Sequence, residues 1–105
     1  MIMKEFINSL TRHIIERTKN PYLRFILKKN SEQQKVKAYK KLSLELFLHT
    51  PGKNIRCLTL QRTENVAGID EQMIWNLMEP YFYDEILKWL KSEDYGRLEK
   101  SLQME

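Results

Sequence analysis

The chain has little cysteine and little glycine, and both shortages exclude classes of chemistry. Cys57 is the single cysteine among 105 residues, so no internal disulfide can form, and we expect a reducing, cytoplasmic compartment. No two cysteine or histidine residues fall at a zinc-ligand spacing, so we expect no metal site. The three glycines, Gly52, Gly68 and Gly96, stand apart, which excludes a glycine-rich phosphate loop. We expect neither a cofactor nor a small-molecule ligand.

Long apolar runs and a secretory signal are also missing. The longest apolar stretches are interrupted by Lys, Glu or Arg before they reach the roughly 18 to 20 residues that a membrane-spanning helix needs. The N-terminal segment Met1–Phe6 lacks the charged start, apolar core and cleavage site of a signal peptide. We therefore expect no membrane partner.

Catalytic patterns are equally scarce. The acidic pairs at 70–71, 84–85 and 93–94 are adjacent in sequence, and adjacent carboxylates on a helix point in different directions. They therefore predict no catalytic dyad, and we expect a protein that is not an enzyme. A length of 105 residues with 42% hydrophobic residues predicts a single folded domain, residues 1–105.

What the chain does have is a strong separation of charge along its length. Residues 1–62 contain fourteen Lys or Arg against four acids, a net charge of +10. Residues 63–105 contain four Lys or Arg against ten acids, a net charge of −6. An asymmetry of this size indicates a polyanionic partner for the basic part, such as DNA or RNA.

Helical periodicity dominates the first forty residues. A stripe of Met3, Ile7, Leu10 and Ile14 predicts a helix over 2–19, which Asn20-Pro21 ends. Proline then suits the first position of a short second helix, 21–29, which would bury Tyr22, Leu23, Ile26 and Leu27. A capping box that begins at Ser31 predicts a third helix over 32–41.

The pattern changes from helical to alternating near Leu42. Leucines at 42, 44, 46 and 48 predict a strand that ends at Thr50. Turn residues at 51–54 and β-favouring residues at 55–62 predict a hairpin. An extension of the third helix through Leu46 is the alternative, so the choice between strand and helix for 42–50 stays open.

The C-terminal part again predicts helix over 69–79 and 81–91, which Pro80 either kinks or restarts, with Met73 and Leu77 facing the core. The last stretch from Glu93 either docks as a short helix or frays. The fold class that follows is mainly α (α+β): a small helical domain with one central β-hairpin. Its element order is that of a winged helix-turn-helix domain, although no residue motif supports this analogy.

The functional prediction is a small, non-enzymatic regulatory protein that binds nucleic acid. Each phosphate that a cation neutralises releases counterions, so a dense basic surface on the second and third helices and the hairpin favours DNA or RNA. The residues of this surface are Arg24, Lys28, Lys29, Lys35, Lys37, Lys40, Lys41, Lys53 and Arg56.

The alternative function is a protein–protein interaction module or a homodimeric adaptor. The acidic C-terminal helices contain more aromatic side chains than one amphipathic helix needs for its own core. Aromatic anchors of this kind dominate protein interfaces. The candidate interface residues are Trp75, Tyr81 and Tyr83.

Overall fold

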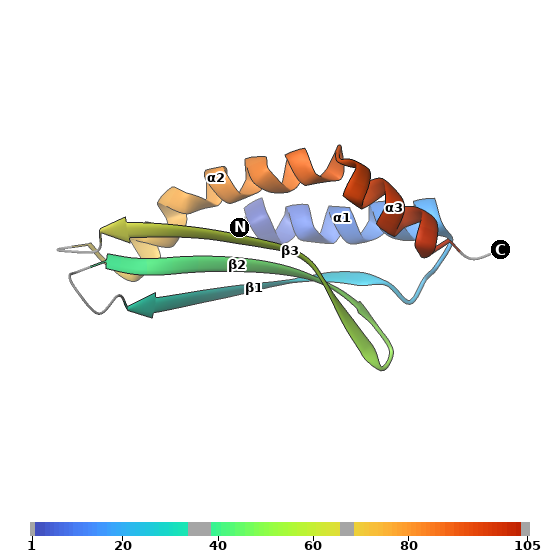
Figure 1. Cartoon of the computed structure of the whole chain (residues 1–105), viewed down its shortest axis with the longest axis horizontal. Coiled ribbons are helices and arrows are strands. Elements are labelled where there is room, and N and C mark those ends of the chain that lie inside the picture. The colour runs from blue at the N-terminus through green and yellow to red at the C-terminus, as the bar shows by residue number, and fades with distance from the viewer. Residues whose placement is uncertain (1, 34–38, 66–68, 104–105) are drawn as a thin grey trace.

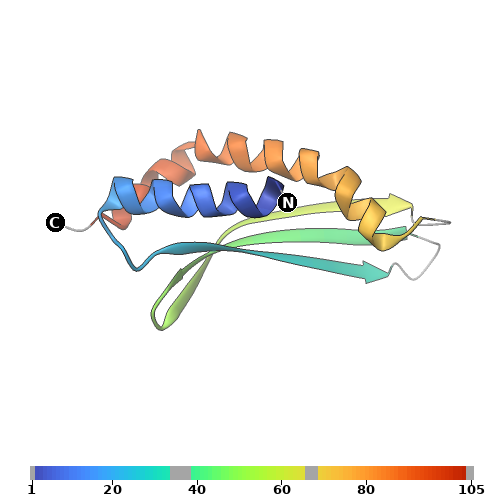
Figure 2. The ribbon, with the colours of Figure 1, turned by 180° about the vertical axis from the view of Figure 1, so that it is seen from behind.

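The computed structural model describes residues 2–33, 39–65 and 69–103 and has three helices on one face of an antiparallel sheet (Figure 1). The elements are α1 (Ile2–Thr18), β1 (Arg24–Gln33), β2 (Tyr39–Thr50), β3 (Lys53–Asn65), α2 (Glu71–Leu90) and α3 (Glu93–Ser101). The strand order is β1-β2-β3, so β2 is central. Views from the front and from behind (Figures 1 and 2) both show the opposite face of the sheet without a helix. The fold is therefore α+β, and the prediction of a mainly helical domain is wrong.

Helix α1 confirms the predicted first helix. Its stripe of Met3, Ile7, Leu10 and Ile14 is buried against the sheet. The helix ends at Thr18, because Lys19 adopts a left-handed conformation with φ 59° and its N–H still donates to the Ile15 carbonyl, at 2.9 Å.

The predicted second helix over 21–29 is wrong, because residues 24–29 belong to β1 and residues 21–23 precede the strand. The apolar residues of this segment are few and are interrupted by Arg24, and periodicity alone does not distinguish a strand from a helix over such a length. Pairing with the strongly alternating β2 makes this segment a strand. Phe25 lies opposite Leu48, and Leu27 lies opposite Leu46. Phe25 is 5% exposed in consequence, whereas Ile26 on the other side of the strand is only half-buried.

The predicted third helix is also wrong wherever the structure describes it. Residues 32–33 end β1 and residues 39–41 begin β2, whereas 34–38 lie outside the described residues. The sheet therefore has three strands where the sequence predicted two. Because the described residues of the second and third predicted helices lie mostly in β1 and β2, the predicted winged-helix element order is wrong.

The hairpin of β2 and β3 confirms the strand prediction for 42–50. All four alternating leucines of β2 are at most 1% exposed and face the helices. The turn at Pro51-Gly52 uses a glycine φ of 82°, which side-chain-bearing residues rarely adopt. In β3, Leu58 faces Leu46 and Arg56 faces Phe47, so Cys57 is an extra, bulged residue that also packs towards the core.

Helix α2 is continuous from Glu71 to Leu90 with Pro80 inside it, so Pro80 does not restart the helix. Its buried side chains are Ile74, Trp75, Phe82, Ile86 and Trp89. Met73 and Leu77 were expected in the core, yet they are 56% and 66% exposed.

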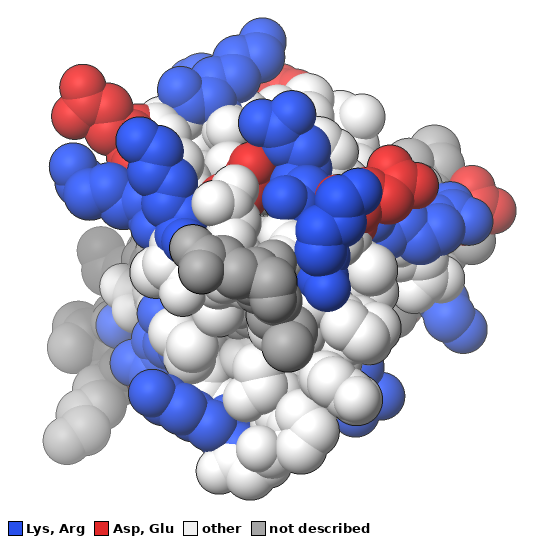
Figure 3. All heavy atoms as spheres, turned by 90° about the vertical axis from the view of Figure 1, so that its right-hand side faces the viewer, with Lys and Arg blue, Asp and Glu red and all other residues white. Residues whose placement is uncertain are grey.

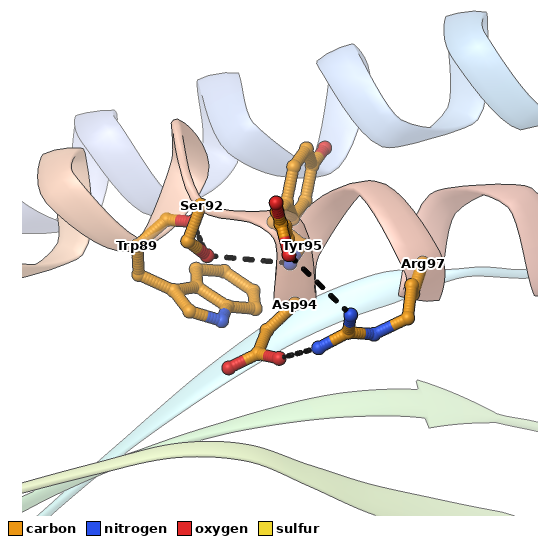
Figure 4. Close-up of polar contacts among 6 residues, drawn as sticks. Trp89, Ser92, Asp94, Tyr95 and Arg97 are labelled. Atoms are coloured by element: carbon orange, nitrogen blue, oxygen red, sulfur yellow. Dashed lines mark hydrogen bonds and ion pairs between the residues drawn. The ribbon is translucent and has the colours of Figure 1, made fainter.

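Of the two alternatives for the last stretch, the structure shows the docked short helix, α3 (Figure 4). Ser92 caps it: the Ser92 hydroxyl accepts from the Tyr95 N–H and donates to the Trp89 carbonyl. The Tyr95 ring is buried edge-on to Trp89, with ring centres 5.0 Å apart. Arg97 forms ion pairs with Glu93 and Asp94 on the outer side of the helix.

Candidate nucleic-acid interface

The side of the sheet away from the helices has no covering element among the described residues, and we call it the open face. Because successive strand residues point to opposite sides and the β2 leucines point to the helices, the residues between them point away from the helices. The open face therefore consists of Arg24, Ile26, Lys28, Asn30 and Glu32 of β1, Lys41, Ser43, Glu45, Phe47 and His49 of β2, and Asn54, Arg56, Thr59, Gln61 and Thr63 of β3.

The open face has a positive net charge. Its four cations and two acids give it a net charge of +2, and its other polar groups are amides, hydroxyls and one imidazole. Arg56 and Glu45 form an ion pair at 3.9 Å, in which the Arg56 side chain stays 62% exposed. A long, exposed pair of this kind contributes little to stability and leaves the cation accessible to a ligand.

Phe47 lies at the centre of this face with a cation on each side of it. The Lys28 ammonium from β1 is 4.7 Å from the centre of the Phe47 ring, and the Arg56 guanidinium carbon from β3 is 5.7 Å from it. Both distances are within the range of a cation–π interaction. An aromatic ring between two cations on an open sheet combines the two contacts by which proteins hold single-stranded nucleic acid, base stacking and phosphate pairing.

The hairpin end of the open face continues the polar surface. Arg24, His49 and Asn54 are neighbours across the three strands, and the His49 Nδ1 shares a hydrogen bond with the Asn54 Oδ1. Lys53 follows the turn and is exposed. Figure 3 shows this end of the molecule: Lys and Arg side chains surround it, and Asp and Glu lie among them in the upper half, towards the helices.

Two of the predicted cations lie on the helix side instead. The Lys29 ammonium pairs with Glu79 of α2 at 3.0 Å, and the Lys40 ammonium pairs with Glu71 of α2 at 2.7 Å. Glu71 also accepts from the Ser31 hydroxyl at 2.6 Å, and these hydrogen bonds from Lys40 and Ser31 lower the pKa of the Glu71 carboxyl. The opposite charges of the two halves of the sequence thus partly neutralise each other within the fold.

The structure brings together Arg24, Lys28, Lys41 and Arg56 on the open face, with Lys53 at its hairpin end. Lys35 and Lys37 lie outside the described residues. Sequence reasoning missed Phe47 as a site residue. The alternation in β2 already separated it from the leucines, and this is the signal that could have found it.

The aromatic residues predicted for a protein interface lie in different environments. Trp75 is 6% exposed and packs against Phe82 in the core, and Tyr83 packs on Phe6 with ring centres 4.6 Å apart. Tyr81 is 37% exposed and Tyr83 is half-buried, so Tyr81 is the most accessible of the three predicted residues.

Within the described ranges no group of three or more His, Cys, Asp or Glu side chains could hold a metal ion. None of the helices described is long and apolar enough to cross a membrane. Comparison of the chain with protein-family models, with curated proteins and with solved structures finds no match.

Proposed function

We propose that this protein is a non-enzymatic, nucleic-acid-binding protein that holds a single strand of DNA or RNA on the open face. The observation that carries the proposal is the position of Phe47, in the central strand of a helix-free sheet face, between the cations of Lys28 and Arg56. In this arrangement a base stacks on the Phe47 ring, and the two cations swing from the ring to the flanking phosphates.

A single strand fits this surface better than a duplex does. Every base has a flat face that can stack on an aromatic ring, but in a duplex those faces are covered by neighbouring base pairs. Lys28 and Arg56 lie in the two outer strands on either side of the ring, so phosphates on both sides of a stacked base are within their reach. The hydroxyl and amide groups of Asn30, Ser43 and Gln61 extend the surface with neutral hydrogen-bonding groups.

The test is fluorescence anisotropy of a labelled oligothymidylate, an oligouridylate and a DNA duplex of equal length, each measured at two salt concentrations. We expect the single strands to bind more tightly than the duplex. Affinity should fall with rising salt, with a slope of about 0.7 per phosphate contacted.

Substitutions separate stacking from general electrostatic attraction. Phe47→Leu keeps an apolar side chain without a π face and should weaken binding about 5- to 150-fold, the usual contribution of one stacked base, whereas Phe47→Tyr should retain affinity. Lys28→Gln should weaken binding and lower the salt slope by about 0.7. Lys91→Gln is the matched control, because it removes the same charge from an exposed position on the helical side.

The proposal fails if the intact protein does not bind any of the three probes at low salt. It also fails if Phe47→Leu binds as tightly as the unsubstituted protein, or if Lys91→Gln lowers the affinity as much as Lys28→Gln does.

A further inference from the structure

An apolar stripe on α2 faces solvent. Met73, Leu77 and Tyr81 are 56%, 66% and 37% exposed, and Ile69 just before the helix is 42% exposed. The four-residue spacing of Met73, Leu77 and Tyr81 places these three along one side of the helix, over about 12 Å at 1.5 Å per residue. We call these four residues the α2 stripe. A contiguous exposed apolar row of this kind marks an interaction site.

The outer side of β3 lies next to this stripe. β3 is an edge of the sheet, and none of the described residues adds a strand to its outer side. The guanidinium carbon of Arg62 in β3 is 4.8 Å from the centre of the Tyr81 ring, so the C-terminal end of the α2 stripe lies beside the strand. One partner can therefore pair with the β3 backbone and cover the stripe.

We propose that the partner is a second copy of this chain, bound by antiparallel pairing of β3 with β3 of the second copy about a two-fold axis at Thr63. In this register Arg62 lies opposite Glu64 of the second copy, and Glu64 lies opposite its Arg62. Within one copy these two side chains already form an ion pair at 2.8 Å, so both charges lie at the edge where the second copy arrives. Axes at Arg62 or Glu64 would place like charges opposite each other, which is unfavourable.

The same axis also pairs the two stripes. α2 runs antiparallel to β3 (Figure 1). The contact of the Arg62 guanidinium with the Tyr81 ring places Tyr81 near the level of Arg62. Leu77 is one helical turn earlier, about 6 Å, which corresponds to about two strand residues and places it level with residues 63–64. Two-fold rotation then packs Leu77 on Leu77 of the second copy, and Met73 on its Tyr81. An isologous interface needs this self-complementarity of both charge and shape.

The interface is small for a stable dimer. It comprises four stripe residues and about five strand residues per copy, fewer than the roughly 20 to 30 residues a side of a standard interface. We therefore expect a dissociation constant on the order of micromolar, so that the monomer and the dimer exchange within an accessible concentration range.

The first experiment measures the mass of the full-length protein by sedimentation equilibrium between about 1 and about 500 µM, a range that brackets a micromolar dissociation constant. We expect a monomer–dimer equilibrium that Leu77→Asp shifts to monomer at all concentrations. Asn76→Asp is the matched control, because it introduces the same charge at the neighbouring exposed position outside the stripe. A protein that is monomeric throughout, or a dimer that Leu77→Asp does not weaken, overturns the proposal.

The second experiment tests the register by disulfide trapping in a Cys57→Ser background. Directly opposed residues have Cα atoms about 4.5 to 5.5 Å apart, which a disulfide can bridge, so Thr63→Cys should give a covalent dimer under mild oxidation. Gln61→Cys points to the same side of β3, but its two copies would be four residues out of register, about 13 Å apart along the strand. Equal trapping of the two variants, or trapping of Gln61→Cys alone, overturns the register. Neither experiment uses nucleic acid, so both are independent of the function proposed above.

Discussion

The assignment of residues 24–33 to a strand predicts opposite outcomes for two neighbouring alanine substitutions. In a helix over 21–29, Ile26 is an inward residue and Phe25 is not. In β1, Phe25 is 5% exposed among the core residues and Ile26 lies half-buried on the open face. Alanine at each position therefore tests the strand directly.

The magnitudes follow from these environments. Phe25→Ala removes a buried ring that faces Leu48 and lies edge-on to Trp89, with ring centres 6.1 Å apart. Loss of the buried area and the cavity that remains should cost about 3 to 5 kcal/mol of the free energy of unfolding. Ile26→Ala removes fewer atoms from a half-exposed position and should cost about 1 kcal/mol.

The assay is urea unfolding followed by circular dichroism, with the slope of the free energy against urea compared among the variants. A domain of this size has about 5 to 15 kcal/mol of stability, so Phe25→Ala can leave the chain partly unfolded in water. In that event Phe25→Leu, with a smaller expected loss, serves in its place. If Ile26→Ala destabilises the protein more than the Phe25 variants do, the strand assignment is refuted.

Four further outcomes are expected. Lys19→Gly should raise stability by about 0.5 to 1 kcal/mol in the same urea assay, because glycine adopts the φ of 59° without strain; a loss would contradict this. Ser92→Ala should lower stability by about 1 kcal/mol through loss of the α3 cap, and an unchanged urea midpoint would disprove the cap. Because the pKa of Glu71 is lowered in the fold, its contribution to stability is present above the unfolded pKa and is lost as the pH falls through the folded pKa. Glu71→Gln should therefore remove that part of the loss of stability in acid, measured by unfolding from pH 6 to pH 3. An unchanged pH profile would argue against this contribution. Burial raises the pKa of the Cys57 thiol, so a thiol reagent at neutral pH should label the native protein more slowly than the unfolded chain, and equal rates would contradict the burial.

The sequence by itself determined the elements whose periodicity is strong. The stripe of α1 and the alternating leucines of β2 each extend over several repeats, so in each segment only one type of secondary structure places all the apolar residues on one face. The Pro51-Gly52 turn and the Ser92 cap follow from local chemistry. These features were predictable because neighbouring residues in the chain supply all the information.

Tertiary structure decided the identity of β1. Its apolar run is too short for a period, so its pairing with β2 made it a strand. The same pairing separated the adjacent lysines at 28–29 and 40–41, because a strand directs successive side chains to opposite faces. Lys28 and Lys41 point to the open face, whereas Lys29 and Lys40 meet the acids of α2.

The sequence alone also could not predict which residues share the open face. A net charge of +10 over residues 1–62 predicts a basic surface, but it cannot tell which cations the acidic helices neutralise. The alternation in β2 separates Phe47 from the leucines, but only the tertiary structure places Lys28 of β1 and Arg56 of β3 on the two sides of its ring. Leu77 became a surface residue because α2 directs Trp75 and Phe82 to the sheet, and one helix cannot turn all its apolar residues towards the same core.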